Sequence, residues 1–282
     1  VDLGAGMTAV SVNAGGYHTC AVLNDGSVKC WGDNDYGQLG DGSTTDRLTP
    51  TAVDLGAGMT AISVSVSGLH SCAVLNDRSV KCWGDNEYGQ IGDGSTTDRS
   101  SPVAVDLGAG MTAVSLSGGS YHTCAVLNDG SVKCWGDNFL GQVGDGTNTN
   151  RSSPVAVDVG AGMTAMSVNA GAVHSCAVLN DGSVKCWGSN GYGQVGDGTT
   201  TDRTSPTAVD VGAGMTVVSV SAGYRHSCAL LNDGSVKCWG DNNWGQLGDG
   251  STTDRLTPTA VDVGTGMTAV SVSAGAYHSC AL

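Results

Sequence analysis

The sequence has almost no phenylalanine and almost no glutamate. It contains one phenylalanine in 282 residues, and Glu87 is its single glutamate. No window keeps a helical period over three turns, which argues against a helical bundle. The 45 glycines instead point to a chain that is dense in turns.

Basic residues are also scarce. Twelve Lys and Arg stand against 26 acidic residues, which gives a net charge of −14. The few cations recur singly, as in VKC and TDR, whereas a nucleic-acid binder needs a cationic face that releases counterions. We therefore expect neither a DNA or RNA partner nor docking to an anionic membrane surface.

A period of 52 residues runs through the whole chain. It carries two series of cysteines, a tryptophan series at 31, 83, 135, 187 and 239, and a histidine series at 18, 70, 122, 174, 226 and 278. A fixed period of this size is typical of solenoids, propellers and linear arrays. We predict one repeat domain over 1–282, with repeats at about 1–52, 53–104, 105–156, 157–208 and 209–260 and a partial repeat at 261–282.

Each repeat is predicted to hold about four strands. In the first repeat they cover 9–15, 18–23, 27–32 and 49–54, and the last one begins with a proline suited to a sheet edge. Glycine-rich connectors such as YGQLGDGSTTDR (36–47) separate them. An all-β fold follows, in which the four-stranded units stack as the blades of a β-propeller.

The repeat unit also resembles a known family. The stretch GGYHTCAVLNDGSVKCWGDNDYGQLGDG (15–42) is similar to the repeat of the regulator of chromosome condensation family, and the likeness covers essentially the whole chain. This resemblance implies a propeller, usually of seven blades. Members differ in function, from nucleotide exchange on a small GTPase to ultraviolet perception and inhibition of secreted β-lactamases, so the resemblance implies architecture more than activity.

The two ends carry the same part of the repeat. Residues 1–22 read VDLGAGMTAVSVNAGGYHTCAV and residues 261–282 read VDVGTGMTAVSVSAGAYHSCAL, whereas a closed ring usually has complementary parts. We interpret the sequence as an excerpt of a longer array. Exchange of half-blades between subunits is the alternative.

Paired cysteines flank an Asn-Asp-Gly turn in each repeat. A three-residue loop at Asn24, Asp25 and Gly26 places Cys20 opposite Cys30, whereas a two-residue turn places the sulfurs on opposite faces. We predict the first turn, and hence hairpin disulfides at Cys20–Cys30, Cys72–Cys82, Cys124–Cys134, Cys176–Cys186 and Cys228–Cys238. Reduced buried thiols and a zinc site are the alternatives, although the spacing is a poor match for zinc.

One repeat departs from this turn. Arg78 stands where the other repeats have glycine, and we expect its hairpin to be the most strained.

Eleven cysteines at fixed spacing favour an oxidising compartment. We therefore expect a secreted or cell-surface protein. No signal peptide, transmembrane run or lipidation motif is recognisable in these residues.

Aspartates in the loops suggest a cation site that has to be weighed against an ordinary role. Asp33, Asp35, Asp41 and Asp46 can offer oxygen ligands to calcium, but aspartate in turns commonly caps local backbone amides. Their spacing matches no ordered calcium loop. We expect no cofactor, with calcium as the alternative.

The recurring histidines and tryptophans have simple interpretations. Each histidine follows a tight turn and starts a strand, so we expect a hydrogen bond to a neighbouring loop, with a shared metal as the alternative. Each tryptophan precedes a glycine and is expected between blades. No candidate nucleophile, base or carboxylate pair stands in a setting of its own, so we predict that the protein is not an enzyme.

Two loops vary between the otherwise near-identical repeats. They present aromatic, aliphatic and arginine side chains, as protein interfaces do on rigid scaffolds. Neutral drift at tolerant turns is the alternative. The predicted protein-binding residues before the histidine are Tyr17, Leu69, Tyr121, Val173, Tyr224, Arg225 and Tyr277, and those after Trp-Gly are Tyr36, Tyr88, Phe139 (followed by Leu140), Tyr192 and Trp244.

Two functions follow from these observations. The first is an extracellular structural or adhesive repeat protein, a disulfide-stapled interaction scaffold that self-assembles, for example into filaments. The second is a specific protein-binding propeller, such as an inhibitor of a secreted enzyme. No catalytic constellation in the sequence supports a third function, that of a hydrolase or lyase.

Overall fold

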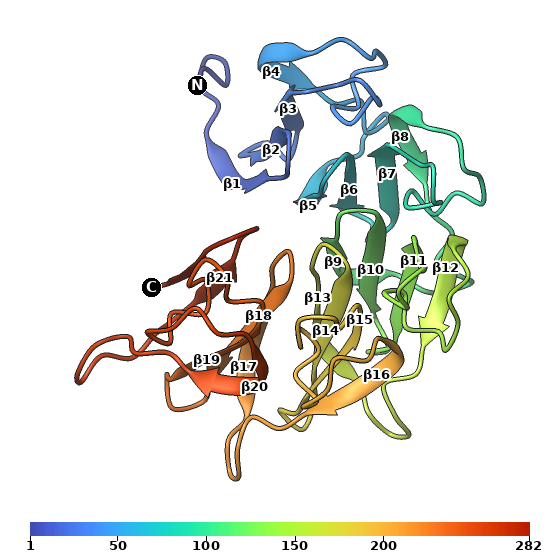
Figure 1. The fold of residues 1–282 in the computed structure, drawn as a ribbon. Coiled ribbons are helices and arrows are strands. Elements are labelled where there is room, and N and C mark those ends of the chain that lie inside the picture. The colour runs from blue at the N-terminus through green and yellow to red at the C-terminus, as the bar shows by residue number, and fades with distance from the viewer. The chain divides into compact units, whose positions relative to one another are not determined.

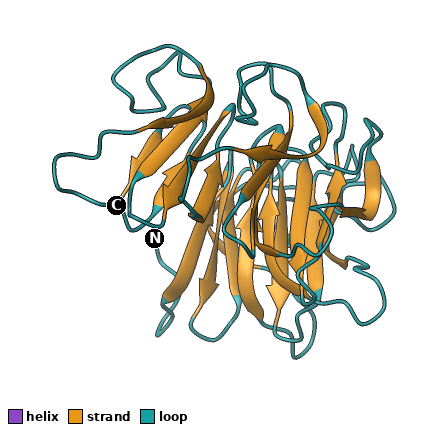
Figure 2. Ribbon diagram, turned by 90° about the horizontal axis from the view of Figure 1, so that it is seen from below, coloured by secondary structure: helices purple, strands orange, loops and turns teal.

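The computed structural model describes residues 1–282 and consists of strands, turns and loops (Figures 1 and 2). It holds no helix with the length and hydropathy needed to cross a bilayer. Contacts within the chain divide it into two compact units. Unit 1 comprises residues 1–129, 133–137 and 150–155, and unit 2 comprises residues 130–132, 138–149 and 156–282.

Each complete repeat forms one four-stranded antiparallel sheet whose strands lie in chain order (Figure 1). The first three blades are β1 (Ala9–Ala14), β2 (His18–Leu23), β3 (Val28–Gly32) and β4 (Arg47–Ala52); β5 (Ala61–Val66), β6 (His70–Leu75), β7 (Val80–Gly84) and β8 (Arg99–Ala104); and β9 (Ala113–Gly118), β10 (His122–Leu127), β11 (Val132–Gly136) and β12 (Arg151–Val157). The next two are β13 (Ala165–Ala170), β14 (His174–Leu179), β15 (Val184–Gly188) and β16 (Arg203–Val209); and β17 (Val217–Ala222), β18 (His226–Leu231), β19 (Val236–Gly240) and β20 (Arg255–Ala260). The partial sixth repeat forms β21 (Val272–Ala274) and β22 (Ser279–Ala281).

The central hairpin of each blade has the predicted three-residue turn. Leu23 N–H donates to Ser27 O at 2.9 Å, and Gly26 adopts a φ of 79°. Because the turn has an odd number of residues, Cys20 pairs directly with Cys30 across β2 and β3. Arg78 adopts the same left-handed conformation, with a φ of 67°, and it is the only non-glycine residue of the chain with a positive φ. The predicted backbone conformation at Arg78 is therefore confirmed.

A disulfide joins the two inner strands of every complete blade. The pairs are Cys20–Cys30, Cys72–Cys82, Cys124–Cys134, Cys176–Cys186 and Cys228–Cys238. In the first pair the Cα atoms are 4.1 Å apart, as expected for residues directly opposite each other at a non-hydrogen-bonded position. Cys280 of the partial repeat is exposed and unbonded.

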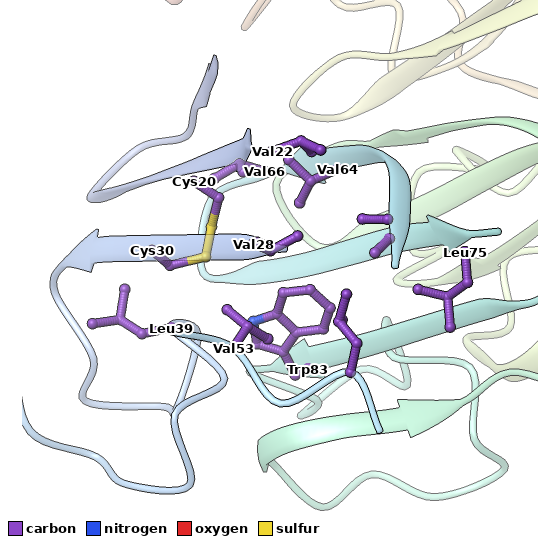
Figure 3. Packing of buried hydrophobic residues seen from close by; sticks show 13 residues of the cluster. Cys20, Val22, Val28, Cys30, Leu39, Val53, Val64, Val66, Leu75 and Trp83 are labelled. Atoms are coloured by element: carbon purple, nitrogen blue, oxygen red, sulfur yellow. A yellow bond between two sulfur atoms is a disulfide. The ribbon is translucent and has the colours of Figure 1, made fainter. Parts of the chain in front are cut away.

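The core lies between consecutive blades. Figure 3 shows Cys20, Val22, Val28, Cys30 and Leu39 of the first repeat packed against Val64, Val66, Leu75 and Trp83 of the second. Val64 is 7% exposed under this cover, whereas Val12, at the same position of the first blade, is 59% exposed. Cys20 and Cys30 are both fully buried, so the first disulfide contributes side-chain volume to the core.

The outer strand differs from its predicted bounds. It covers Arg47–Ala52 rather than 49–54, so Pro50 lies inside β4 instead of starting it. The ladder pairs Cys30 with Thr51 and then Gly32 with Arg47, and the register shifts between these pairs. Proline is tolerated there because an irregular edge strand does not require its missing N–H.

Candidate functional site

The two variable loops of each repeat lie side by side at one end of the blade. In the first repeat Asp33 N–H donates to Tyr17 O at 3.2 Å. This follows from the hairpin, because His18 pairs with Gly32 and both loops leave the same end of it. Later repeats repeat the bond at 2.8–3.0 Å, from Asp85 to Leu69, Asp137 to Tyr121, Ser189 to Val173 and Asp241 to Arg225. We call the turn before the histidine and the loop after Trp-Gly, taken together, the loop face.

The loop after Trp-Gly is held by a buried asparagine. Asn34 Nδ2 donates to the carbonyls of Ser43 and Thr45 at 3.0 and 3.1 Å, and its Oδ1 accepts from Leu39 N–H at 2.9 Å. Gln38 Oε1 accepts from the backbone N–H of Tyr36 at 2.9 Å, which fixes the residue that carries the variable ring. The later repeats use the same contacts, so the variable side chains stand on a rigid base.

Three of the four loop aspartates, Asp33, Asp41 and Asp46, accept hydrogen bonds within this base, whereas Asp35 is exposed. Asp41 Oδ2 lies 2.7 Å from Arg47 Nε, and Asp46 Oδ1 accepts from Asn34 N–H at 2.8 Å. Burial alone would raise the pKa of Asp41, but hydrogen bonds from Ser43 and Arg47 hold that pKa below its usual value. Such contacts are the backbone- and side-chain-capping role that aspartate usually has in turns.

The predicted binding residues all lie on the loop face but differ in exposure. Tyr17, Phe139, Trp244 and Tyr277 are 55–75% exposed. Tyr36 and Tyr121 are 41% and 38% exposed. The remaining members are partly buried: Leu69, Tyr88, Val173, Tyr192, Tyr224 and Arg225.

Several of these side chains contact each other across neighbouring repeats. The rings of Tyr88 and Tyr121 meet edge to face, with centroids 5.5 Å apart. At the same two positions in unit 2, Arg225 lies 4.8 Å from the ring centroid of Tyr192 and donates to its hydroxyl at 3.0 Å. The loop after Trp-Gly therefore works together with the turn before the histidine of the next repeat, a pairing that the sequence analysis missed. Its signal was a constant separation of 33 residues.

A second network lies beneath the loop face and joins each blade to the next. Gln38 O accepts from Trp83 Nε1 at 2.9 Å and from Ser71 Oγ at 3.1 Å. Because Ser71 uses its only proton on this carbonyl, its oxygen accepts from His18 Nε2, 2.7 Å away. His18 therefore carries a proton on Nε2, and its buried Nδ1 has no hydrogen-bond partner, so the ring is neutral.

The same network recurs in later repeats. His70 contacts Thr123, His174 contacts Ser227 and His226 contacts Ser279, at 2.8–2.9 Å. Burial lowers the pKa of His18, His122 and His226 to about 4 and that of His70 to about 3. The histidines do form hydrogen bonds, but their partners are hydroxyls on strands of the next blade and not the neighbouring loop that was predicted. The predicted inter-blade position is confirmed for Trp83, Trp135, Trp187 and Trp239, whereas Trp31 is only partly buried. The glutamine carbonyl was not foreseen, although Gly-Gln recurs in every complete repeat.

A cavity of about 200 Å³ lies in unit 2 beside the partial repeat. Its walls include Gln246, Gly248, Val261 and Tyr277. One repeat earlier the corresponding place is filled, because the indole of Trp239 lies against Gly196 and its Nε1 donates to Gln194 O at 2.9 Å. The cavity therefore lies where the tryptophan of a following blade packs in the other repeats, and we assign it no small-molecule ligand.

Comparisons with known proteins agree with this architecture. Two sequence models, both described as regulator of chromosome condensation (RCC1) repeat, match the chain: one at 25–74, 79–126, 129–178, 181–230 and 233–282, the other at 9–38, 61–90, 113–142, 167–194 and 217–246. The ultraviolet-B receptor UVR8 of Arabidopsis thaliana is 32% identical over 278 residues, which cover 98% of this chain and 63% of UVR8. The chain therefore spans less than two thirds of the length of this relative.

Solved structures with the same fold include human WBSCR16 and yeast RCC1 (Prp20), the latter in a complex with Kap60. WBSCR16 has a TM-score of 0.87 at 23% identity and is matched over 98% of this chain and 72% of its own. Prp20 has a TM-score of 0.84 at 23% identity, over 97% of this chain and 67% of its own. At this identity the likeness concerns the fold, and it confirms the predicted all-β propeller built from four-stranded blades.

Proposed function

Because the chain belongs to the regulator of chromosome condensation (RCC1) repeat family, we propose that it acts outside the cytosol as a disulfide-stapled scaffold that binds another protein through its loop face. One observation carries this proposal. The side chains that vary between repeats gather at one end of the blades, on loops fixed by buried asparagine and glutamine hydrogen bonds.

Rigid loops with exposed rings are suited to protein recognition. Tyr17 and Trp244 are 68% and 75% exposed, so most of each ring is available to a partner. Aromatic anchors lose little side-chain entropy when they bind, and a preformed base reduces the cost of ordering the loop. Yeast RCC1 in complex with Kap60 is one member of the family with a protein partner.

The disulfides support an oxidising compartment. Five bonds are buried within hairpins and recur in every complete blade, a density that is rare in the reducing cytosol. Secretion or display at the cell surface is the corresponding location. The near-identity of the repeats favours an adhesive or structural scaffold that self-assembles. An inhibitor of a secreted enzyme is the second candidate, and the differences between the loop faces of the repeats favour it.

A capture experiment with matched variants tests the proposal. The chain is immobilised and exposed to the extracellular fraction of its source, and bound proteins are identified and quantified by mass spectrometry. A loop-face variant carries Tyr17→Ser, Tyr36→Ser and Tyr121→Ser, and a control variant carries Val10→Ser, Ile62→Ser and Val114→Ser, which are exposed apolar residues of β1, β5 and β9.

We expect one partner in a fixed ratio to the wild-type chain and the control, and its loss from the loop-face variant. A partner that the loop-face variant retains would contradict the proposal. Electron micrographs separate the two candidates, because filaments that contain only this chain indicate self-assembly, whereas discrete complexes with a second protein indicate a specific binder.

A further inference from the structure

We propose that the loop face of unit 1 binds an arginine-rich segment of the partner protein, with a guanidinium group seated against the Tyr88–Tyr121 ring pair beside the carboxylates of Asp85 and Glu87. The inference rests on the proposed protein-binding function and names the chemistry of the partner. Three observations support it: the ring geometry, the uncompensated charge and an equivalent contact inside unit 2.

The rings form a platform that a planar cation can approach. Tyr88 and Tyr121 meet at an interplanar angle of 69°, so one ring presents its face next to the edge of the other. Tyr121 is 38% exposed, and Tyr17 and Tyr36 on the same unit are 68% and 41% exposed. Arginine stacks on such faces through cation–π contact, and its weaker hydration makes this contact more favourable for arginine than for lysine.

Two carboxylates beside this platform, the buried Asp85 and the exposed Glu87, are not paired with a cation of the chain. Arg47 and Arg99, at the start of the outer strands, are paired with Asp41 and Asp93. The lysines lie toward the opposite end of the blades, where Lys81 Nζ donates to Leu55 O at 2.9 Å.

The titration of the neighbouring groups is consistent with this charge. Glu87, burial and the carboxylates of Asp137 and Asp85 raise the pKa of Tyr88. Burial, and then the negative charges of Asp98 and Glu87, raise the pKa of Asp85. A cation bound here therefore relieves repulsion that is already present.

The same position in unit 2 is already occupied by an arginine of the chain. Arg225 stands where unit 1 has Tyr121, and its guanidinium lies 4.8 Å from the ring centroid of Tyr192 and 5.0 Å from that of Tyr224. The loop beneath it reads SNGY (189–192), with Ser189 and Gly191 in place of the two carboxylates, whereas the second repeat reads DNEY (85–88). In unit 2 an arginine of the chain therefore lies on the tyrosine ring, and the two acids of the loop are absent. In unit 1 the two acids are present, and a tyrosine stands in place of the arginine.

Natural differences between the repeats supply variants for the test. Asp85→Ser with Glu87→Gly copies the loop at 189–192, where Gln194 Nε2 donates to Ser189 Oγ at 3.2 Å. Tyr88→Leu with Tyr121→Leu copies the leucines found at positions 140 and 69.

The matched control also removes two negative charges, but at a different place in unit 1. Asp54 accepts a hydrogen bond from Gly56 N–H at 2.9 Å, and Asp106 accepts one from Gly108 N–H at 2.8 Å. The control variant Asp54→Asn with Asp106→Asn removes both charges but keeps a side-chain oxygen for each of these bonds.

The binding assay uses defined peptides and the full chain. Acetylated and amidated (Arg-Gly)₃, (Lys-Gly)₃ and (Glu-Gly)₃ are titrated against each protein at low and moderate salt, with tyrosine ring signals followed by NMR. We expect the arginine peptide to bind more tightly than the lysine peptide and the glutamate peptide to show no saturable shifts. Each double variant at the platform should weaken arginine binding about five- to tenfold, on the order expected for the loss of a cation–π contact or of nearby negative charge, and the control should change it less than about twofold.

Equal binding of the arginine and glutamate peptides to the wild-type chain would overturn the inference, as would unchanged arginine binding in the Asp85→Ser/Glu87→Gly variant. Binding that does not weaken with added salt would overturn it as well, because exposed charge pairs are screened. These outcomes leave the capture experiment intact, since a partner without basic residues would still be lost from the loop-face variant there.

Discussion

Trp83 of the second repeat donates a hydrogen bond from its indole Nε1 to the backbone carbonyl of Gln38 in the first, at 2.9 Å and across 45 residues of sequence. The tryptophan is fully buried, so this bond satisfies the only polar atom of a large ring in the space between blades. The same relationship links Trp135 to Gln90, Trp187 to Gln142 and Trp239 to Gln194. Blade-to-blade cohesion therefore rests on a repeated polar contact within an apolar interface.

Replacing Trp135 with phenylalanine should destabilise unit 1 by about 2–4 kcal/mol, because both the hydrogen bond to Gln90 O and part of the buried ring volume are lost. Denaturant unfolding measures the change. Trp31→Phe is the control, since Trp31 is only partly buried and should tolerate the change with a smaller loss. Equal losses in both variants would contradict the role of the inter-blade bond.

Removing one disulfide with Cys72→Ala and Cys82→Ala should cost about 3 kcal/mol, since a closed loop of 11 residues restricts the unfolded chain by about 2.8 kcal/mol in the loop-entropy account. Thermal unfolding with and without reductant measures the effect. Cys280→Ala changes an exposed, unbonded cysteine and should leave the melting temperature nearly unchanged. A transition that reductant does not move would refute a stabilising role for the hairpin disulfides.

Lowering the pH from 6.5 to 4 should destabilise the fold through its buried histidines. The pKa of an unfolded histidine is about 6.5, whereas burial lowers that of His70 to about 3 and that of His122 to about 4 in the folded chain. Between these values the unfolded state binds protons that the folded state does not, so stability is fully present above pH 6.5 and is lost as the pH falls.

The slope of unfolding free energy against pH tests this linkage. His70→Gln should reduce the slope between pH 6.5 and 4 by about 1.4 kcal/mol per pH unit, whereas His278→Gln, at an exposed position, serves as the control. Nitrogen chemical shifts should also show His18 with its proton on Nε2. A slope that His70→Gln leaves unchanged would mean that His70 is already protonated in the fold.

Replacing Arg78 with glycine should stabilise the second hairpin by about 0.5–1 kcal/mol, because its φ of 67° is unfavourable for a residue with a Cβ atom. The gain is partly offset by the greater freedom of glycine in the unfolded chain. Arg78→Ala removes the charge but keeps the Cβ atom, so it should give no such gain. A destabilised Arg78→Gly variant would show that contacts of the arginine side chain outweigh the backbone cost.

The hairpins could be predicted in detail because their determinants are local. Asn24, Asp25 and Gly26 specify a turn of three residues, and that number alone sets Cys20 against Cys30. The loop face was predicted only as two separate sets of residues. Whether Tyr88 contacts Tyr121 depends on how one blade sits on the next, and that is fixed by the Trp–Gln and His–hydroxyl contacts rather than by either loop.

The amino-acid sequence by itself determined the repeat length, the four-strand meander, the turn type and the cysteine pairing, because each depends on residues within one repeat. Only the tertiary structure decided which side chains meet across repeats: the indole with the glutamine carbonyl, the imidazole with the next hydroxyl and the arginine or tyrosine with the preceding ring. These contacts join residues 33 to 53 positions apart, and their geometry is set by the stacking of whole sheets, which no single segment encodes.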